Sequence, residues 1–240
     1  MKRPLPSQER LIFALDVPSR EEALRMIELL DDAVVFYKIG LELFTAGVAF
    51  ELIDVLQARG KKIFLDLKLF DIPRTVGAAV KRLEGRGIDL LTVHAGDAAI
   101  LESASAAARE ISPRDSDRGL GILAVTVLTS IATGDEEQIR KLVLERACQA
   151  RDAGCAGVVA SGHEVEALRA ELGDSMSIVV PGIRAQKSRP ADDQKRTVDV
   201  EEAFEKGADF IVVGRPIRNA KDPRRAARAI QDRIAAHFRH

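Results

Sequence analysis

Eight short apolar runs, each followed by a segment with helical spacing of its apolar residues, alternate along the 240-residue chain. The runs have the length of buried strands and cover residues 11–15, 34–37, 63–68, 89–93, 120–128, 156–160, 177–180 and 210–213. Strands that alternate with helices form a parallel sheet covered by helices. Eight such units fit a closed (β/α)8 barrel, which typically has ~250 residues. We therefore expect an α/β fold, a TIM barrel that occupies residues 1–240 as a single domain.

The predicted helices fill the intervals between these runs. They cover about residues 19–30, 43–59, 73–85, 98–111, 136–153, 163–172, 200–206 and 223–238, with Ser19 as an N-cap and Gly60 closing the second helix. An open doubly wound sheet is the structural alternative, since it shows the same alternation. The count of eight units and the lack of an early G-x-G-x-x-G disfavour it.

Charge and composition narrow the possible partners and the compartment. The net charge is −1, and acidic and basic residues are interspersed, which disfavours a nucleic-acid binder. No apolar run approaches the ~20 residues that span a bilayer, and residues 1–10 contain no apolar signal core. Cys148 and Cys155 have no metal-type or redox-type spacing. We expect a cytoplasmic protein with reduced cysteines and neither nucleic acid nor membrane as a partner.

One stretch carries more charge than a buried strand tolerates without a reason. Asp66, Lys68 and Asp71 follow directly after the apolar run 63–65. Residues two apart on a strand point to the same face, so the side chains of Asp66 and Lys68 should project together. Burying such ions is costly because each loses its hydration. The charges either neutralise one another in a structural network or serve chemistry.

Polar residues also recur where the other predicted strands end. In (β/α)8 barrels the active site lies at the C-terminal ends of the strands. The residues at these ends are Asp16, Lys38, Asp66, Lys68, Asp71, His94, Thr129, Pro181, Gly182, Gly214 and Arg215. Two lysines and two carboxylates that meet at one barrel mouth favour a catalytic site, with a structural ion network as the alternative.

Two features indicate a phosphorylated ligand. Gly214 and Arg215 follow the eighth run, and the loops after strands seven and eight are the usual phosphate site of this fold. Glycine lets backbone N–H groups approach an anion, and arginine offers a bidentate fork. The segment 183–198 is long and basic, so we expect a lid that closes over the phosphate, with a solvated surface loop as the alternative.

The stretch from Asp66 to Pro73 resembles the D-x-K-x-x-D-I-P signature of the orotidine 5′-monophosphate decarboxylase family. Shorter resemblances follow in the family's order over nearly the whole chain. They are Leu15-Asp16-Val17, Lys38-Ile39-Gly40, Val93-His94-Ala95, residues 125–130, residues 181–184, Asp193-Gln194 and Val213-Gly214-Arg215. One departure is Asp97-Ala98, where the family commonly has a Gly-Gly pair.

The resemblance implies a decarboxylase that uses neither cofactor nor metal and converts orotidine 5′-monophosphate to UMP, the last step of de novo pyrimidine nucleotide synthesis. It implies that Lys68 protonates C6 of the base and that Asp66 lies beside the substrate carboxylate. Lys38 and Asp71 would complete the alternating charges. It also implies a homodimer with shared active sites, in which one subunit contributes Asp71, Ile72 and Thr75 to the site of its partner.

The resemblance assigns the remaining substrate contacts by position. Asp16 and Lys38 would contact the ribose, and Thr129 would lie near the pyrimidine. Strand parity does not decide between Thr126 and Thr129; the match to the family's Leu-Thr-Ser favours Thr129. The phosphate would be bound by Arg184, Gln194, Gly214 and Arg215.

Two other functions remain open at this point. Metal-dependent relatives of the same barrel superfamily, sugar-phosphate decarboxylases and aldolases, resemble the chain at D-x-K-x-x-D. They need a carboxylate at the end of the second strand to hold Mg²⁺, where this chain has Lys38, which would repel a cation. A non-catalytic phosphate-binding barrel would not require Lys38, Asp66, Lys68 and Asp71 to be intact.

Overall fold

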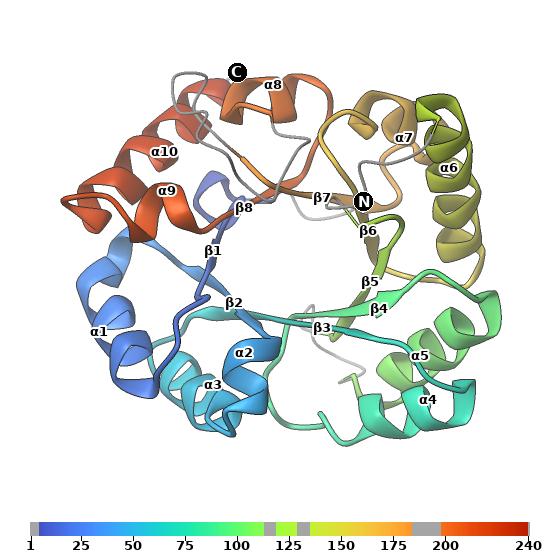
Figure 1. The fold of residues 1–240 in the computed structure, drawn as a ribbon, viewed down its shortest axis with the longest axis horizontal. Coiled ribbons are helices and arrows are strands. Elements are labelled where there is room, and N and C mark those ends of the chain that lie inside the picture. Colours follow the sequence, from blue (N-terminus) through green and yellow to red (C-terminus); the bar gives the residue numbers. More distant parts are fainter. Residues whose placement is uncertain (1–4, 113–118, 129–134, 184–197, 240) are drawn as a thin grey trace.

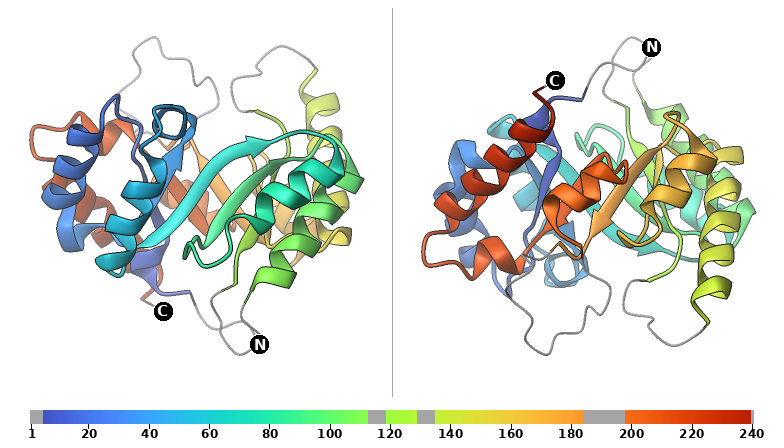
Figure 2. Two further views of the ribbon diagram at one scale, coloured as in Figure 1. Left: turned by 90° about the horizontal axis from the view of Figure 1, so that it is seen from below. Right: turned by 90° about the horizontal axis from the view of Figure 1, so that it is seen from above.

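The computed structural model describes residues 5–112, 119–128, 135–183 and 198–239. Eight parallel strands close into a barrel in chain order, with β1 paired to both β2 and β8. Figure 1 shows the barrel from one end, and Figure 2 shows the strands inclined within the surrounding helices. The predicted (β/α)8 barrel is confirmed, and the open doubly wound sheet is excluded.

The strands agree with the predicted apolar runs to within a few residues. They are β1 (Leu11–Ala14), β2 (Phe36–Gly40), β3 (Lys62–Leu69), β4 (Leu90–His94), β5 (Gly121–Val125), β6 (Gly157–Val159), β7 (Ser177–Pro181) and β8 (Phe210–Val213). The helices are α1 (Arg20–Leu30), α2 (Leu41–Thr45), α3 (Ala49–Ala58), α4 (Pro73–Lys81), α5 (Ala98–Ile111), α6 (Glu136–Asp152), α7 (Val165–Leu172), α8 (Val200–Glu205), α9 (Arg215–Arg218) and α10 (Pro223–His237). No described helix is both long enough and apolar enough to cross a membrane.

The core has two shells because successive side chains of a strand point to opposite faces. On β1, Leu11 and Phe13 belong to the shell shared with the helices, whereas Ile12 and Ala14 belong to a smaller cluster inside the barrel. The inner cluster consists of Ile12, Ala14, Phe36, Phe64, Leu123, Val179, Phe210 and Val212. Lys38 and Asp66 follow Phe36 and Phe64 by two residues on their strands and therefore point to the same inner face. These two charged side chains lie directly above the apolar inner cluster, which forms the floor of the barrel mouth.

The structure differs from the sequence prediction at three places. The single helix expected over 43–59 is wrong: α2 and α3 are separated near Gly47, whose φ of 77° breaks the helical path. The strand predicted over 120–128 is shorter in the structure, where β5 ends at Val125. The short helix α9 was not predicted at all, because its four residues follow β8 without any apolar period.

The N-terminal ends of two helices agree with their sequences. Ser19 caps α1 by accepting a hydrogen bond from the Glu22 amide, as predicted. Asp97, at the departure from the family pattern, caps α5 by accepting from the Ala99 amide. The turn therefore keeps a helix start without the glycine pair. The ends of the predicted lid, Ile183 and Val198, form a parallel bridge, and residues 184–197 lie outside the described residues.

Candidate active site

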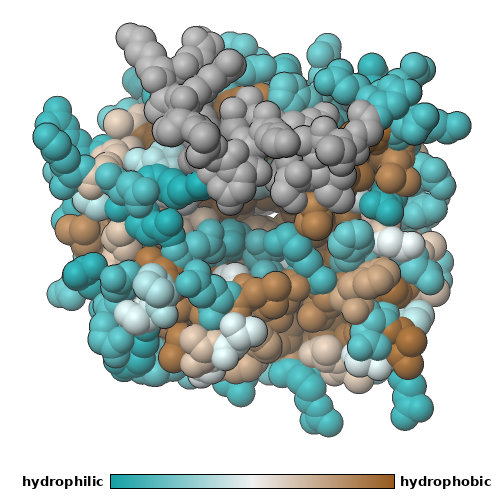
Figure 3. All heavy atoms as spheres, viewed as in Figure 1, coloured by the Kyte–Doolittle hydropathy of each residue, from teal (hydrophilic) through white to brown (hydrophobic). Residues whose placement is uncertain are grey.

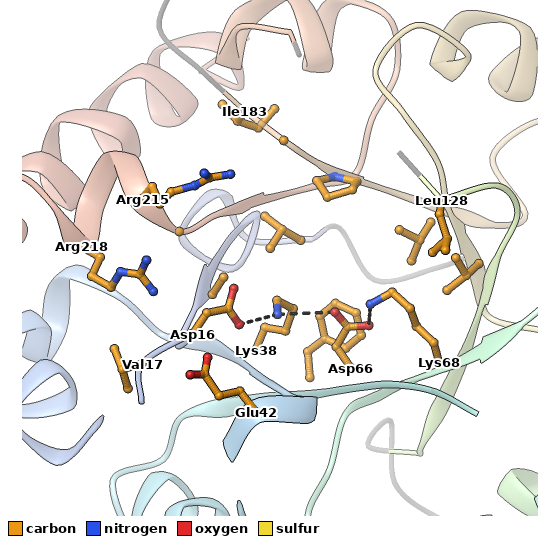
Figure 4. Close-up of a pocket in the computed structure, with 18 of the residues that line it drawn as sticks. Asp16, Val17, Lys38, Glu42, Asp66, Lys68, Leu128, Ile183, Arg215 and Arg218 are labelled. Atoms are coloured by element: carbon orange, nitrogen blue, oxygen red, sulfur yellow. Dashed lines mark hydrogen bonds and ion pairs between the residues drawn. The ribbon is translucent and has the colours of Figure 1, made fainter. Parts of the chain in front are cut away.

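A cavity of about 820 Å³ opens at the C-terminal ends of the strands. Figure 4 shows its lining, and Figure 3 shows a central hollow with a band of hydrophilic side chains directly below it. The predicted strand-end residues that line it are Asp16, Lys38, Asp66, Lys68, Pro181, Gly182, Gly214 and Arg215. The fold thus brings together residues from both ends of the chain, as the barrel interpretation predicted.

Four of these residues form a continuous row of alternating charge, Asp16, Lys38, Asp66 and Lys68, which we call the charge row. Lys38 Nζ lies 2.9 Å from Asp16 Oδ1 and 3.4 Å from Asp66 Oδ2. Lys68 Nζ lies 2.8 Å from Asp66 Oδ1. The side chains of Lys38 and Asp66 are only 11% and 13% exposed, whereas that of Lys68 is 36% exposed. The inner pair is therefore shielded from water, and the Lys68 ammonium borders the open cavity.

The surroundings keep the inner pair ionised. Burial opposes the charged form of Lys38, but Asp66 and Asp16 outweigh it and hold the pKa of the ammonium above its usual value. Burial likewise opposes the charged form of Asp66. The two lysines and the hydrogen bonds of its carboxylate nevertheless keep the pKa of Asp66 below its usual value. Both charges of the inner pair are therefore retained and held in place by their neighbours, an arrangement that electrostatic stabilisation of a reacting group requires.

Glycine at position 40 makes room for the row. Gly40 pairs with Asp66 in the β2–β3 register. A Cβ atom at Gly40 would lie 3.3 Å from both Asp16 Oδ1 and Lys38 Nζ, a contact tighter than side chains normally make. A side chain there would require Asp16 or Lys38 to move by a few tenths of an ångström.

The end of β3 is not a regular strand. Lys68 has a φ of 50°, in the left-handed region, and the β3–β4 register shifts between Leu65 and Leu69. The predicted common direction of Asp66 and Lys68 is confirmed, since their side chains bond to each other. The buried Thr92 of β4 bonds to both residues. Thr92 was missed at the sequence level because a threonine inside an apolar strand carries no distinguishing signal.

Three predicted residues lie away from the cavity of their own chain. Asp71, Ile72 and Thr75 are exposed and do not line the cavity, and the Asp71 carboxylate accepts a hydrogen bond from the Ile72 amide. Ile72 is 64% exposed, as is the neighbouring Phe70. In Figure 3, apolar side chains gather around the position of β3. A large exposed apolar patch of this kind typically marks an interaction surface.

Of the two threonines considered in the sequence, Thr126 lies within the described residues. Thr126 is fully buried, and its hydroxyl donates to the Val159 carbonyl, so the hydroxyl is already engaged within the barrel wall. Thr129, Arg184 and Gln194 lie outside the described residues. His94, at the end of β4, does not line the cavity and packs edge-on against the Phe70 ring. Burial, with Arg146 and Lys68 nearby, lowers the pKa of the His94 imidazole.

Two guanidinium groups lie near the Asp16 end of the charge row, away from Lys68 (Figure 4). Arg215 and Arg218 both come from α9 and line the cavity (Figure 4). Arg218 was missed at the sequence level because α9 itself was not predicted. Its spacing of three residues from Arg215 was the available signal. The cavity thus has a cationic end at α9 and an alternating row on the side of β1 to β3, and the described residues hold no cluster of metal-ligand type.

Comparison with known proteins agrees with this geometry. Residues 9–230 match the model of the orotidine 5′-phosphate decarboxylase / HUMPS family. The chain is 53% identical over 242 residues to an orotidine 5′-phosphate decarboxylase from Methylococcus capsulatus, with 98% of this chain and 96% of that protein covered. For the one from Stenotrophomonas maltophilia the identity is 49% over 239 residues, with coverages of 97% and 95%.

The fold has a solved counterpart as well. The crystal structure of an orotidine 5′-phosphate decarboxylase from Lactobacillus acidophilus superposes with a TM-score of 0.80 and 37% identity. The superposition covers 94% of this chain and 99% of that chain. This chain therefore belongs to the orotidine 5′-phosphate decarboxylase / HUMPS family.

Proposed function

We propose that this chain decarboxylates orotidine 5′-monophosphate to UMP and CO₂, the last step of de novo pyrimidine nucleotide synthesis. The observation that carries the proposal is the charge row in a cavity that bears Arg215 and Arg218 near the Asp16 end of the row and leaves Lys68 at the other end. A nucleotide fits this arrangement, because its anionic phosphate can lie at the arginines while the reacting base at its other end reaches the Lys68 end of the charge row. The family membership and the relatives that carry this name support the same reaction.

The two ends of the cavity suggest one orientation of the substrate. Gly214 and Arg215 bind the phosphate, with Arg184 and Gln194 joining them. Asp16 and Lys38 contact the ribose, and Thr129 lies near the pyrimidine. The base then reaches the Lys68 end of the charge row. Binding energy gained at the phosphate and ribose, remote from the reacting carbon, is available to hold the base in the reactive position.

The charge row fits the chemistry of this step. Loss of CO₂ from C6 leaves a carbanion that the pyrimidine ring delocalises poorly. The Lys68 ammonium stabilises the developing charge electrostatically and then donates its proton to C6. Asp66 lies beside the substrate carboxylate, and the buried Lys38 keeps Asp66 ionised throughout. The apolar inner cluster below the charge row lowers the local dielectric constant, so each of these electrostatic interactions is stronger than it would be in bulk water.

The metal-dependent sugar-phosphate reaction of the same family is disfavoured by Lys38. Its ammonium lies between Asp16 and Asp66, within 2.9 and 3.4 Å of their oxygens. A divalent cation at these carboxylates would face that fixed positive charge at close range, which is strongly unfavourable. A non-catalytic barrel is disfavoured by the intact row itself, since phosphate binding alone does not require buried charges near the base.

A spectrophotometric assay tests the proposal. The purified protein is mixed with orotidine 5′-monophosphate, and the loss of substrate absorbance is followed with and without EDTA. We expect turnover at the same rate in both samples. Absence of turnover would support the non-catalytic barrel, and turnover that EDTA abolishes would support a metal-dependent reaction.

We further propose a homodimer in which each site is completed by Asp71, Ile72 and Thr75 of the other subunit. The support is that these residues are exposed and turned away from their own cavity, next to the exposed apolar side chains of Phe70 and Ile72. An apolar patch beside polar residues without a site in their own chain fits an isologous contact between two copies.

Mixing two inactive variants tests the shared site. Lys68→Ala and Asp71→Ala chains are each assayed alone and then after subunit exchange. A mixed dimer has one intact site, so random exchange should restore about one quarter of the wild-type activity per site. The extent of exchange is measured by differential labelling. Confirmed exchange without recovered activity would contradict the shared site.

We also place the enzyme in the cytoplasm. Cys148 and Cys155 are both unpaired, and Cys155 is buried beside the Ser105 hydroxyl, which suits a reducing compartment. Cell fractionation followed by immunodetection checks this assignment; recovery of the protein outside the cytoplasmic fraction would contradict it.

A further inference from the structure

Thr92 occupies a buried position directly behind the reacting groups. The residue is fully buried on β4 and does not line the cavity. Its hydroxyl oxygen accepts a hydrogen bond from the Lys68 amide at 2.9 Å and donates one to Asp66 Oδ1, also at 2.9 Å. A carboxylate cannot donate, so the direction of the second bond is fixed. One side chain therefore holds two members of the charge row.

The strand register explains why this hydroxyl is needed. Leu65 pairs with Leu91 and Leu69 pairs with Val93, so the three residues between them on β3 face only Thr92 on β4. The extra residues form a bulge, which leaves backbone groups without their regular ladder partners. The Thr92 hydroxyl replaces the missing carbonyl acceptor for the Lys68 amide. This bond supports the left-handed φ of 50° at Lys68, a strained backbone for a residue other than glycine.

The contacts close into a ring. Thr92 binds the Lys68 amide and the Asp66 carboxylate, and the same Asp66 oxygen accepts from Lys68 Nζ at 2.8 Å. The side chain of Lys68 is thereby restrained at both of its ends. Without the hydroxyl, the Asp66 carboxylate can rotate and the Lys68 backbone can leave the left-handed region, and either movement displaces the ammonium.

We propose that Thr92 is a positioning residue that sets the Lys68 ammonium and the Asp66 carboxylate in the geometry required for proton delivery. The inference rests on the proposed decarboxylation and adds to it a residue outside the cavity. Thr92 acts on the chemical step through Lys68 and Asp66 and makes no contact with the bound nucleotide. Its removal should therefore affect kcat and leave nucleotide binding largely intact.

Thr92→Val tests this because it removes the hydroxyl and keeps the shape. A misplacement of about 1 Å in a reacting group costs about 100-fold in rate, and we expect a loss of kcat of that order. KM, and the affinity for UMP measured by calorimetry, should stay within about threefold, since these contacts lie elsewhere in the cavity. Thr92→Ser, which restores the hydroxyl, should recover most of the lost kcat.

Ser105→Ala is the matched control. It removes another buried hydroxyl, one that contacts Cys155 between α5 and the start of β6, and should leave kcat unchanged. If Thr92→Val fails to fold, Thr92→Ser is compared with Thr92→Ala. These two variants lack the same methyl group and differ in the hydroxyl, so a kcat ratio above about 10 supports the proposal.

Three outcomes would overturn the inference. The first is a Thr92→Val enzyme with wild-type kcat. The second is a loss of kcat that Thr92→Ser does not recover. The third is a fall in kcat matched by a loss of UMP-binding sites, which would mean a purely structural role. Failure of the wild-type protein itself to turn over orotidine 5′-monophosphate would instead refute the proposed function.

Discussion

Two clusters of alternating charge can be compared within this molecule. The charge row lies at the barrel mouth, whereas a surface cluster of Asp31, Asp32, Arg224 and Arg228 joins the turn after α1 to α10. In the surface cluster Arg224 Nη2 lies 2.7 Å from Asp32 Oδ1, and Arg228 Nη2 lies 3.0 Å from the same atom. These distances match those of the charge row. The Asp32 side chain, however, is 66% exposed, against 13% for Asp66.

The comparison shows that ion-pair distances alone do not separate a candidate active site from an ordinary surface cluster. Water screens the surface cluster, and such pairs contribute little to stability. The charge row stands on an apolar floor where solvent is excluded, so its field acts on whatever enters the cavity. The position of the charges at strand ends separates the two clusters, and that position could be recognised in the sequence.

Removal of one cation from each cluster should show the largest difference. Lys68→Ala should lower kcat by about 10³- to 10⁴-fold, because it removes the group that we propose as both electrostatic stabiliser and proton donor. Arg224→Ala, the matched change in the surface cluster, should leave kcat unchanged. The measurement is the rate of substrate absorbance loss at saturating orotidine 5′-monophosphate. A similar loss of kcat in both variants would show that the charge row and the surface cluster do not differ in their effect on turnover.

The second-largest difference between the two clusters should be in their contribution to the free energy of unfolding. Lys38→Met leaves the buried Asp66 carboxylate with a single lysine and should lower the free energy of unfolding by about 3 kcal/mol, the lower end for a broken buried pair. Arg224→Met should leave it unchanged within the precision of the measurement. Denaturant unfolding monitored by circular dichroism gives both values. If Lys38→Met raised the free energy of unfolding, burying the Lys38 charge would cost more free energy than its ion pairs with Asp16 and Asp66 return.

The dependence on pH and salt should be a smaller effect. The pKa of Asp66 in the folded protein is below its usual value of 3.8, and that of Asp32 is lowered by Arg224 and Arg228 to about 2. A lowered pKa contributes stability that is present above the usual value and is lost as the pH falls through the folded value. The free energy of unfolding should therefore decrease as the pH falls below about 4.

Salt then distinguishes the two carboxylates. The screening length falls from about 10 Å at 0.1 M to about 3 Å at 1 M ionic strength. Asp32→Asn should reduce the acid sensitivity of stability at 0.1 M NaCl only, whereas Asp66→Asn should reduce it at both concentrations. An Asp66→Asn effect that disappears at 1 M NaCl would show that water screens the row as it screens the surface.

The smallest effect is expected for Arg228→Ala. Its side chain is 55% exposed and its guanidinium pairs with Asp32, which Arg224 also contacts. We expect neither the unfolding midpoint nor kcat to change measurably. A clear loss of thermal stability would indicate that the surface cluster acts as a cooperative network.

The sequence predicts the main parts of the site because its signals are local. Apolar runs that end in Asp16, Lys38 and Gly214 place these residues at the barrel mouth once eight units are counted. The common direction of Asp66 and Lys68 follows from strand parity, although the structure achieves it through a bulge and a left-handed Lys68. A rule of alternation thus gave the right result on an irregular backbone.

The remaining parts depend on contacts between distant segments. Thr92 gains its role only because β3 is longer than β4 between two register points, which no pattern within either strand reveals. The position of Arg218 at the cavity depends on α9, a helix of four residues that is too short to show a helical period of apolar residues in the sequence. The break between α2 and α3 at Gly47 was missed because an isolated glycine within an apolar helical pattern is often tolerated.

The closure of the barrel has a consequence for protein synthesis. β1 pairs with β8, so Leu11 finds its partner Ile211 near the other end of the chain. Asp16 and Arg215, which follow these two neighbouring strands, therefore come together at the cavity only after almost the whole chain has left the ribosome. A nascent or truncated chain without β8 exposes the edges of β1 and β7, which are templates for aggregation. We therefore expect a chain that ends before β8 to be inactive and prone to aggregation.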